Sequence, residues 1–175
     1  MNKVILIGGS KSLIKDKLGK TIDSFDIVCR LNTGGRPECL TGEYKDIIGS
    51  KTTIWLGKHL GLFNAYKNNT YKTVIPFPSE SKLIKDCKET LYNFNKFNAR
   101  PTSGILAIFH LLKEYKYITI CGFDGFKGGH FYGNRFIKNQ DESDKMAAKG
   151  IGAHDIFKET EYINYLIKTN KIKIL

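Results

Sequence analysis

The chain has 175 residues, of which 41% are hydrophobic and 26% are charged, a composition typical of one globular domain. No apolar run approaches the ~20 residues of a membrane-spanning helix, and the start of the chain lacks the features of a signal peptide, so we expect a single soluble domain over residues 1–175. The 28 Lys and Arg residues against 17 Asp and Glu residues give a formal charge of +11, which favours an anionic partner: nucleic acid, an acidic membrane surface or a phosphorylated small molecule.

The predicted elements alternate between strands and helices along the chain. Val4–Ile7 is a short apolar run that predicts a strand, and after a glycine turn a helix is predicted to begin at Ser12. Later apolar runs predict strands over residues 27–29, 52–56, 73–75, 117–121 and 172–175. Hydrophobic periodicity predicts helices over residues 81–94, 103–114 and 156–169. This alternation predicts an α/β fold with a mainly parallel sheet.

The four cysteines do not form a recognisable metal or disulfide motif. They are widely scattered, with no C-x-x-C pair and no histidine at zinc-ligand spacing. A chain of this length closes its core without disulfides or metal. We interpret Cys29, Cys39, Cys87 and Cys121 as buried or free thiols of a reducing compartment.

The turn that follows the first strand contains Gly8, Gly9 and Ser10. Glycines let a backbone approach a phosphate, and a helix after such a turn directs N–H groups at an anion. The spacing matches neither a Walker P-loop nor a full G-x-G-x-x-G motif. A tight connection without a ligand explains this turn equally well.

A second candidate anion site precedes the helix predicted over residues 103–114. Thr102, Ser103 and Gly104 place hydroxyls and a small residue at the start of that helix. Such residues cap a helix, and they also form a compact pocket for an anion at the positive end of the helix dipole. Both interpretations remain open.

Two histidines lie in or beside the glycine-rich segment 125–152, which we interpret as a surface loop or an active-site lid. His130 and His154 each offer an imidazole that titrates near neutral pH, although a loop histidine is more often solvated than catalytic. Glu159 suits the first turn of the last helix for electrostatic reasons alone. The absence of an Asp-x-Asp sequence removes the usual carboxylate ligands of a nucleotide-bound metal ion, so we expect protein groups to neutralise any phosphate.

Taken in order, these segments resemble the sialyl motifs of glycosyltransferase family 29, the animal-type sialyltransferases that use CMP-sialic acid. The similarity extends over nearly the whole chain, and the joint pattern is far more specific than any of its parts. Residues 5–32 are similar to the long motif and 49–53 to its sequel, residues 101–123 to the short motif, 130–132 to the third motif, and His154 with Glu159 to the very short motif.

The resemblance implies a Rossmann-like, mainly parallel sheet with helices on both faces, the GT-A-like variant of sialyltransferases. It implies an inverting, metal-independent transfer from CMP-sialic acid or a related CMP-sugar to a glycan acceptor, with no cofactor. His154 would be the catalytic base, and His130 would assist the departing phosphate. The donor-binding residues that it implies are Gly8, Gly9, Ser10, Asn32, Thr102, Ser103, Gly104 and Glu159.

The chain departs from the family pattern in three respects. Gly9 stands where the family commonly has an asparagine that contacts the nucleotide. The usual cysteine pair is absent, with Tyr115 at its second position, which agrees with a cytoplasmic protein. We also expect no stem and no membrane anchor of the kind found in the animal enzymes, and we expect acceptor recognition to fall to the segment 125–152 or to a partner protein.

Three alternatives remain at this point. A CMP-Kdo-dependent transferase would use the same chemistry, because both sugars carry a carboxylate at the anomeric carbon. A catalytically silent CMP-sugar-binding protein would keep the pocket without the transfer. A basic nucleic-acid-binding protein would explain the charge, but the lysines are distributed along the chain and no nucleic-acid-reading motif is present.

Overall fold

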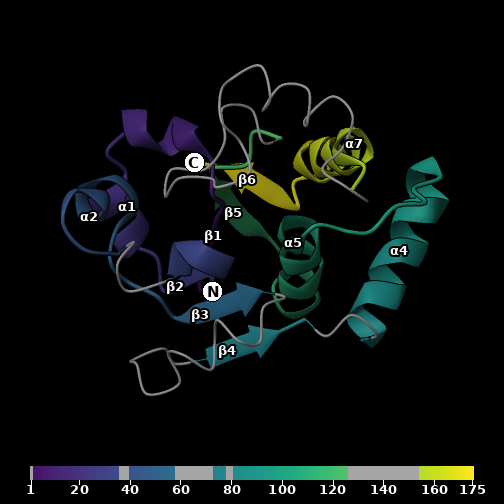
Figure 1. Ribbon diagram of the computed structural model, residues 1–175, viewed down its shortest axis with the longest axis horizontal. Coiled ribbons are helices and arrows are strands. Elements are labelled where there is room, and N and C mark those ends of the chain that lie inside the picture. Colours follow the sequence, from purple (N-terminus) through teal and green to yellow (C-terminus); the bar gives the residue numbers. More distant parts are fainter. Residues whose placement is uncertain (1, 36–39, 58–72, 78–80, 126–153) are drawn as a thin grey trace.

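The computed structural model of the protein describes residues 2–35, 40–57, 73–77, 81–125 and 154–175. These segments form one sheet and the helices that cover it (Figure 1). Within them, no helix is long and apolar enough to cross a membrane. His130 and Cys39 lie outside the described residues, as does nearly all of the segment 125–152.

Six parallel strands form the sheet, in the order β4-β3-β2-β1-β5-β6. All six predicted strands are confirmed, with ends that differ from the prediction by up to two residues, and every pair of neighbouring strands is parallel. The order of the strands reverses between β1 and β5, where Ile7 pairs with Cys121. The bounds are Val4–Ile7 for β1, Ile27–Leu31 for β2, Ile54–Gly57 for β3, Thr73–Pro76 for β4, Ile118–Cys121 for β5 and Ile172–Ile174 for β6.

The long helices follow the predicted periodicity closely. They are α4 (Lys82–Asn95), α5 (Ser103–Glu114) and α7 (Ile156–Lys168). The shorter helical segments are η1 (Lys11–Lys15), α1 (Gly19–Asp23), η2 (Asn32–Gly35) and α2 (Glu43–Ile48).

The helix predicted from Ser12 is instead a short 3-10 turn followed by a separate helix. The hydroxyl of Ser10 caps η1 by accepting from the Ser12 amide, so the turn begins one residue earlier than predicted. Lys17 has a φ of 43°, in the left-handed region, and this backbone conformation cannot continue a helix. The chain therefore becomes helical again only at Gly19, where α1 begins.

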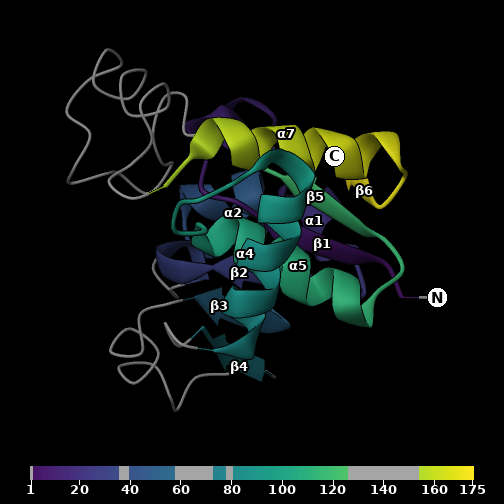
Figure 2. The same cartoon turned by 90° about the vertical axis from the view of Figure 1, so that its right-hand side faces the viewer.

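Alternate residues of each strand face opposite layers of helices. Val4 and Leu6 pack into the core under α4, α5 and α7, whereas Ile5 and Ile7 pack into the core under η1, α1 and α2. In Figure 1, α1 and α2 lie on one side of the sheet and the three long helices on the other. Figure 2 shows the same arrangement after a quarter turn, with α7 beside β6 in both views. The prediction of helices on both faces is confirmed.

Candidate active site at the carboxyl edge of the sheet

The carboxyl ends of β1 and β5 lie side by side, and the turns that follow them are joined. The Gly8 amide donates to the Cys121 carbonyl at 2.8 Å, and the Ser10 amide donates to the Gly122 carbonyl at 3.2 Å. In a parallel α/β sheet, ligands bind outside the carboxyl ends of the strands at the point where the strand order reverses. The predicted glycine turn therefore lies at the position in the fold that is most suited to a ligand.

Neither Gly8 nor Gly122 has room for a side chain. A Cβ atom on Gly8 would lie 2.1 Å from the Gly122 carbonyl oxygen. Gly122 itself has a φ of +71°, and a Cβ atom there would lie 2.6 Å from the Leu13 side chain. Gly8 thus serves the packing of two turns against each other, which is a structural reason for a glycine at this position.

The ring of Phe123 lies between the glycine turn and the start of α5. One ring atom is 3.0 Å from the Cβ position of Gly8, and another is 3.0 Å from the Cβ position of Gly104. The two segments that the sequence predicted as anion sites are therefore separated by about the width of one aromatic ring. This contact is the direct evidence that the long-motif-like and short-motif-like segments meet.

Ser10 is 3% exposed, and its hydroxyl is surrounded by protein partners. It donates to the carboxylate of Asp124, accepts from the Ser12 amide at 3.0 Å and lies 2.7 Å from the Ser12 hydroxyl. This arrangement favours a structural role for Ser10 over direct contact with a donor.

Asp124 was missed by the sequence analysis. A signal for it exists, because Ser10 and Asp124 each stand three positions after Ile7 and Cys121, which are partners in the register of β1 and β5. Polar residues at the same offset beyond two adjacent parallel strands are expected to meet. Recognising this requires the strand order, which the sequence did not provide.

Thr102 and Glu159 connect the starts of α5 and α7. The carboxylate of Glu159 accepts from the Thr102 amide at 2.7 Å and from the Thr102 hydroxyl at 2.5 Å. The same hydroxyl accepts from the Ile105 amide at 3.2 Å, so Thr102 is the N-cap of α5. Both side chains are buried, at 7% and 4% exposed. These bonds stabilise the start of α5. That Thr102 and Glu159 contact a donor stays a prediction.

His154 lies next to the segment that leads into α5. Its Nδ1 atom contacts the carbonyl oxygen of Arg100, two residues before Thr102. A carbonyl only accepts, so Nδ1 carries the proton and Nε2 is the unprotonated nitrogen of the neutral ring. Asp155 caps α7 by accepting from the Lys158 amide at 3.1 Å, which fixes the backbone beside His154. His154 is therefore held beside the segment that leads into α5.

Asn32 stands at the end of β2, the neighbour of β1, and therefore at the same edge of the sheet. Its φ is 42°, and its carbonyl oxygen accepts from the Trp55 indole at 2.7 Å. Gly35 lies against the same indole, where a Cβ atom would be only 2.3 Å from Nε1. The buried Trp55 thereby holds the backbone of η2 and sets where Asn32 stands.

The predicted site residues divide into two groups by burial. Gly8, Ser10, Thr102 and Glu159 are buried and engaged within the protein. The half-buried residues among them are Gly9, Asn32, Ser103, Gly104 and His154. The first group stabilises the site from within the protein, and the second group is partly exposed at the sheet edge. Sequence patterns alone did not make this distinction.

The buried cysteines Cys29 and Cys121 are not available as nucleophiles. Cys29, Cys87 and Cys121 are buried, in agreement with the interpretation made from sequence. Burial raises the pKa of the Cys29 and Cys121 thiols to about 12, so both stay protonated at neutral pH. Among the described residues, no group of His, Cys, Asp and Glu is arranged to hold a metal ion.

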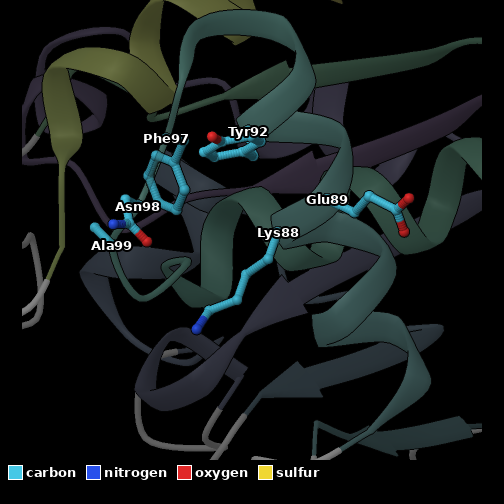
Figure 3. Close-up of a pocket in the computed structure, with 6 residues that line it drawn as sticks. All are labelled: Lys88, Glu89, Tyr92, Phe97, Asn98 and Ala99. Atoms are coloured by element: carbon cyan, nitrogen blue, oxygen red, sulfur yellow. The ribbon is translucent and has the colours of Figure 1, made fainter.

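A hollow of about 200 Å³ lies beside α4. Figure 3 shows its lining, in which Lys88, Glu89 and Tyr92 come from α4 and Phe97, Asn98 and Ala99 from the chain that follows. It contains none of the predicted site residues and no buried polar side chain among those six. We therefore place the candidate site at the sheet edge and not in this hollow.

Comparison with known proteins agrees with this fold. The family model described as glycosyltransferase family 29 (sialyltransferase) matches residues 1–77. No curated protein matches the chain by sequence. Among solved structures, the fold is similar to a mammalian sialyltransferase, with a TM-score of 0.65 and 19% identity over 99% of this chain and 68% of the other. It is also similar to a mammalian sialyltransferase in complex with Gal-beta-1-3GalNAc-ortho-nitrophenol, with a TM-score of 0.66 and 18% identity over 99% of this chain and 69% of the other.

Proposed function

We propose that this chain, whose first 77 residues match the family 29 model and whose fold is similar to that of mammalian sialyltransferases, is a sialyltransferase-like glycosyltransferase that transfers an acidic sugar from a CMP donor to an acceptor hydroxyl. The sugar is sialic acid or a close relative with a carboxylate at the anomeric carbon. The acceptor is a glycan, and the reaction takes place in the cytoplasm without a metal ion.

The observation that carries this proposal is the contact of His154 with the chain just before α5. Because Nδ1 donates to the Arg100 carbonyl, Nε2 is the nitrogen that takes a proton from the acceptor hydroxyl. The start of α5 lies beside this imidazole, since Arg100 is three residues before Ser103. A direct displacement requires a base close to the group that binds the phosphate. Here the base and the helix that binds the phosphate lie on adjacent segments.

The donor phosphate binds, in this proposal, at the half-buried residues Ser103 and Gly104. They occupy the first turn of α5, where backbone N–H groups and the helix dipole favour negative charge. As the bond from the anomeric carbon to the phosphate oxygen breaks, CMP leaves with the electron pair and its charge is stabilised by these amides. His130 assists the departing phosphate in this proposal. It lies outside the residues that the structure describes.

The step balances as a single displacement. The acceptor oxygen loses its proton to Nε2 of His154 and forms a bond to the anomeric carbon, while the bond to the CMP oxygen breaks on the opposite face. One displacement inverts the configuration of that carbon. No group on the enzyme becomes covalently attached to the sugar.

The decisive variant is His154→Ala, assayed by CMP release with CMP-sialic acid and a panel of glycan acceptors. Removing a general base typically lowers turnover by about 10²–10⁴-fold. We expect a loss of that size with CMP affinity unchanged within about twofold, because binding depends on α5. His110→Gln is the matched control, since His110 lies in α5 with its pKa lowered by burial and takes no part in the step.

The donor assay also separates the alternatives. CMP-Kdo is tested in parallel with CMP-sialic acid, and the faster donor identifies the sugar. Full turnover by the His154→Ala variant contradicts the role of the base. CMP binding without turnover of either donor by the parent protein indicates a silent binder. Salt-dependent binding of a random oligonucleotide that CMP does not displace indicates a nucleic-acid-binding protein.

A further inference from the structure

We propose that Asp124 is a positioning residue, which fixes the Gly8–Ser10 turn through the Ser10 hydroxyl and so prepares the turn for the donor. This inference rests on the proposed function. Asp124 directly follows Phe123, and it bonds to Ser10 across the junction between β1 and β5.

The hydrogen bonds of the Ser10 hydroxyl can be counted in full. A hydroxyl has one proton to donate and two lone pairs to accept with. An ionised carboxylate only accepts, so the Ser10 proton is donated to Asp124. The Ser12 hydroxyl, 2.7 Å away, must then be the donor of its bond to Ser10, and the Ser12 amide donates the second bond at 3.0 Å.

This count makes Asp124 the group that sets the direction of the other bonds. With the Ser10 proton held by the carboxylate, both Ser10 lone pairs are turned toward Ser12 and the start of η1. Without the carboxylate, the two hydroxyls can exchange donor and acceptor roles, and the cap on η1 loses its fixed orientation.

Three consecutive residues after β5 act together on the site. The carbonyl of Gly122 holds the Ser10 amide, the ring of Phe123 lies against Gly8 and Gly104, and the carboxylate of Asp124 holds the Ser10 hydroxyl. The turn beside Gly9 is therefore held from one side by a single short segment. A preformed turn binds its part of the donor more tightly than a turn that must first be ordered.

Electrostatics argue against direct contact between Asp124 and the donor. A carboxylate placed against a phosphate raises the energy of both charges, because like charges disfavour each other's ionised forms. An Asp124 that works through Ser10 avoids this cost, since its carboxylate is bonded to the buried Ser10 hydroxyl. The expected effect of Asp124 is therefore on donor affinity and not on the chemical step.

The test is a double-mutant cycle with Asp124→Ala, Ser10→Ala and the combined variant. Calorimetry measures CMP affinity, and CMP release measures kcat and KM. We expect each single variant to weaken CMP binding by roughly tenfold, the size of one lost hydrogen bond, with kcat changed less than about twofold. The combined variant should bind CMP no more weakly than whichever single variant has the lower CMP affinity. The reason is that each single substitution already removes the bond between Ser10 and Asp124.

Two further variants keep the outcome interpretable. Asp124→Asn retains an oxygen that accepts from Ser10 and should restore most of the affinity. Asp26→Ala is the matched control, because the Asp26 carboxylate bonds to the Lys3 amide at 2.7 Å just before β2, at the opposite edge of the sheet. Additive losses in the cycle, or unchanged CMP affinity in Asp124→Ala, overturn the proposal.

Hydrogen exchange of residues 8–13 distinguishes failure of this inference from failure of the proposed function. If the parent protein does not bind CMP, the proposed function is wrong, and the exchange experiment still decides the role of Asp124. Faster exchange of this segment in Asp124→Ala and in Ser10→Ala, but not in Asp26→Ala, supports the positioning role. Unchanged exchange in both variants overturns it.

Discussion

At residue 8 the backbone of a neighbouring turn occupies the space that a side chain would need. The nearest obstacle is the Gly122 carbonyl oxygen, which cannot move aside without breaking its bond to the Ser10 amide. Gly104 differs, because the nearest atom to its Cβ position belongs to the Phe123 ring. A ring on a side chain can shift by a few tenths of an ångström more easily than a hydrogen-bonded backbone.

Gly8→Ala should therefore destabilise the protein more than Gly104→Ala. Overpacking typically costs about 1–3 kcal/mol, and we expect Gly8→Ala at or above the upper end and Gly104→Ala at or below the lower end. Urea denaturation followed by circular dichroism measures both free energies of unfolding. Equal losses in the two variants would contradict the packing that we describe around Phe123.

The sequence named most of the residues at this edge but not their roles. Spacing and motif similarity were enough to select Ser10, Thr102 and Glu159. That Ser10 is engaged by Asp124, and Thr102 by Glu159, depends on which strands are neighbours and where the helices begin. Hydrogen-bond partners far apart in sequence are set by the tertiary structure, and one sequence contains no direct record of them.

Among the elements, α5 and α7 are coupled at their starts by one buried carboxylate. Glu159 lies in the first turns of α7, and both of its oxygens accept bonds from Thr102 at the N-cap of α5. Removing one partner of a buried hydrogen bond costs about 1–3 kcal/mol, because the other partner loses water without compensation.

Glu159→Ala should lower the free energy of unfolding by at least that amount, and Thr102→Val should lower it by a similar amount. The effects should not add in the double variant, since the two side chains share their bonds. Glu161→Ala is the control, because Glu161 is an exposed residue of α7 whose carboxylate meets Asn95 at 3.1 Å. Thermal and urea unfolding of the four variants measure the coupling, and fully additive effects would contradict it.

The elements themselves were largely predictable from local pattern. The apolar stripe placed α4 to within one residue, and the capping residues before the buried helix placed α5 with its observed bounds. The segment after Ser10 was predicted less well. A side-chain cap at Ser10 and a positive φ at Lys17 divide it into η1 and α1, and neither feature has a periodic signal.

At the scale of the whole molecule, the alternation of elements indicated a parallel sheet but did not give its strand order. The order places β1 in the middle of the sheet, next to both β2 and β5, and this is what brings the first and second halves of the chain to one edge. The net positive charge was equally visible in the sequence, but the sequence did not show which anionic ligand it serves.

The formal charge of +11 should attract the anionic donor more than a neutral ligand. We expect CMP affinity to fall roughly tenfold between about 50 mM and 500 mM NaCl. At the higher concentration, salt screens attraction between charges that are more than a few ångströms apart. Cytidine, which lacks the phosphate, should bind with nearly the same affinity at both salt concentrations. Calorimetry with the two ligands measures the difference, and an equal response of both would contradict an electrostatic contribution.

The single ring between two glycines also constrains how this protein can diverge. A larger residue at 104 becomes acceptable once Phe123 is exchanged for a shorter aliphatic side chain, so these two positions should change together over evolutionary time. Position 8 has no such escape, because its obstacle is a carbonyl that every residue at 122 would supply. Of Gly8 and Gly104, only Gly104 can therefore be replaced when the side chain next to it changes.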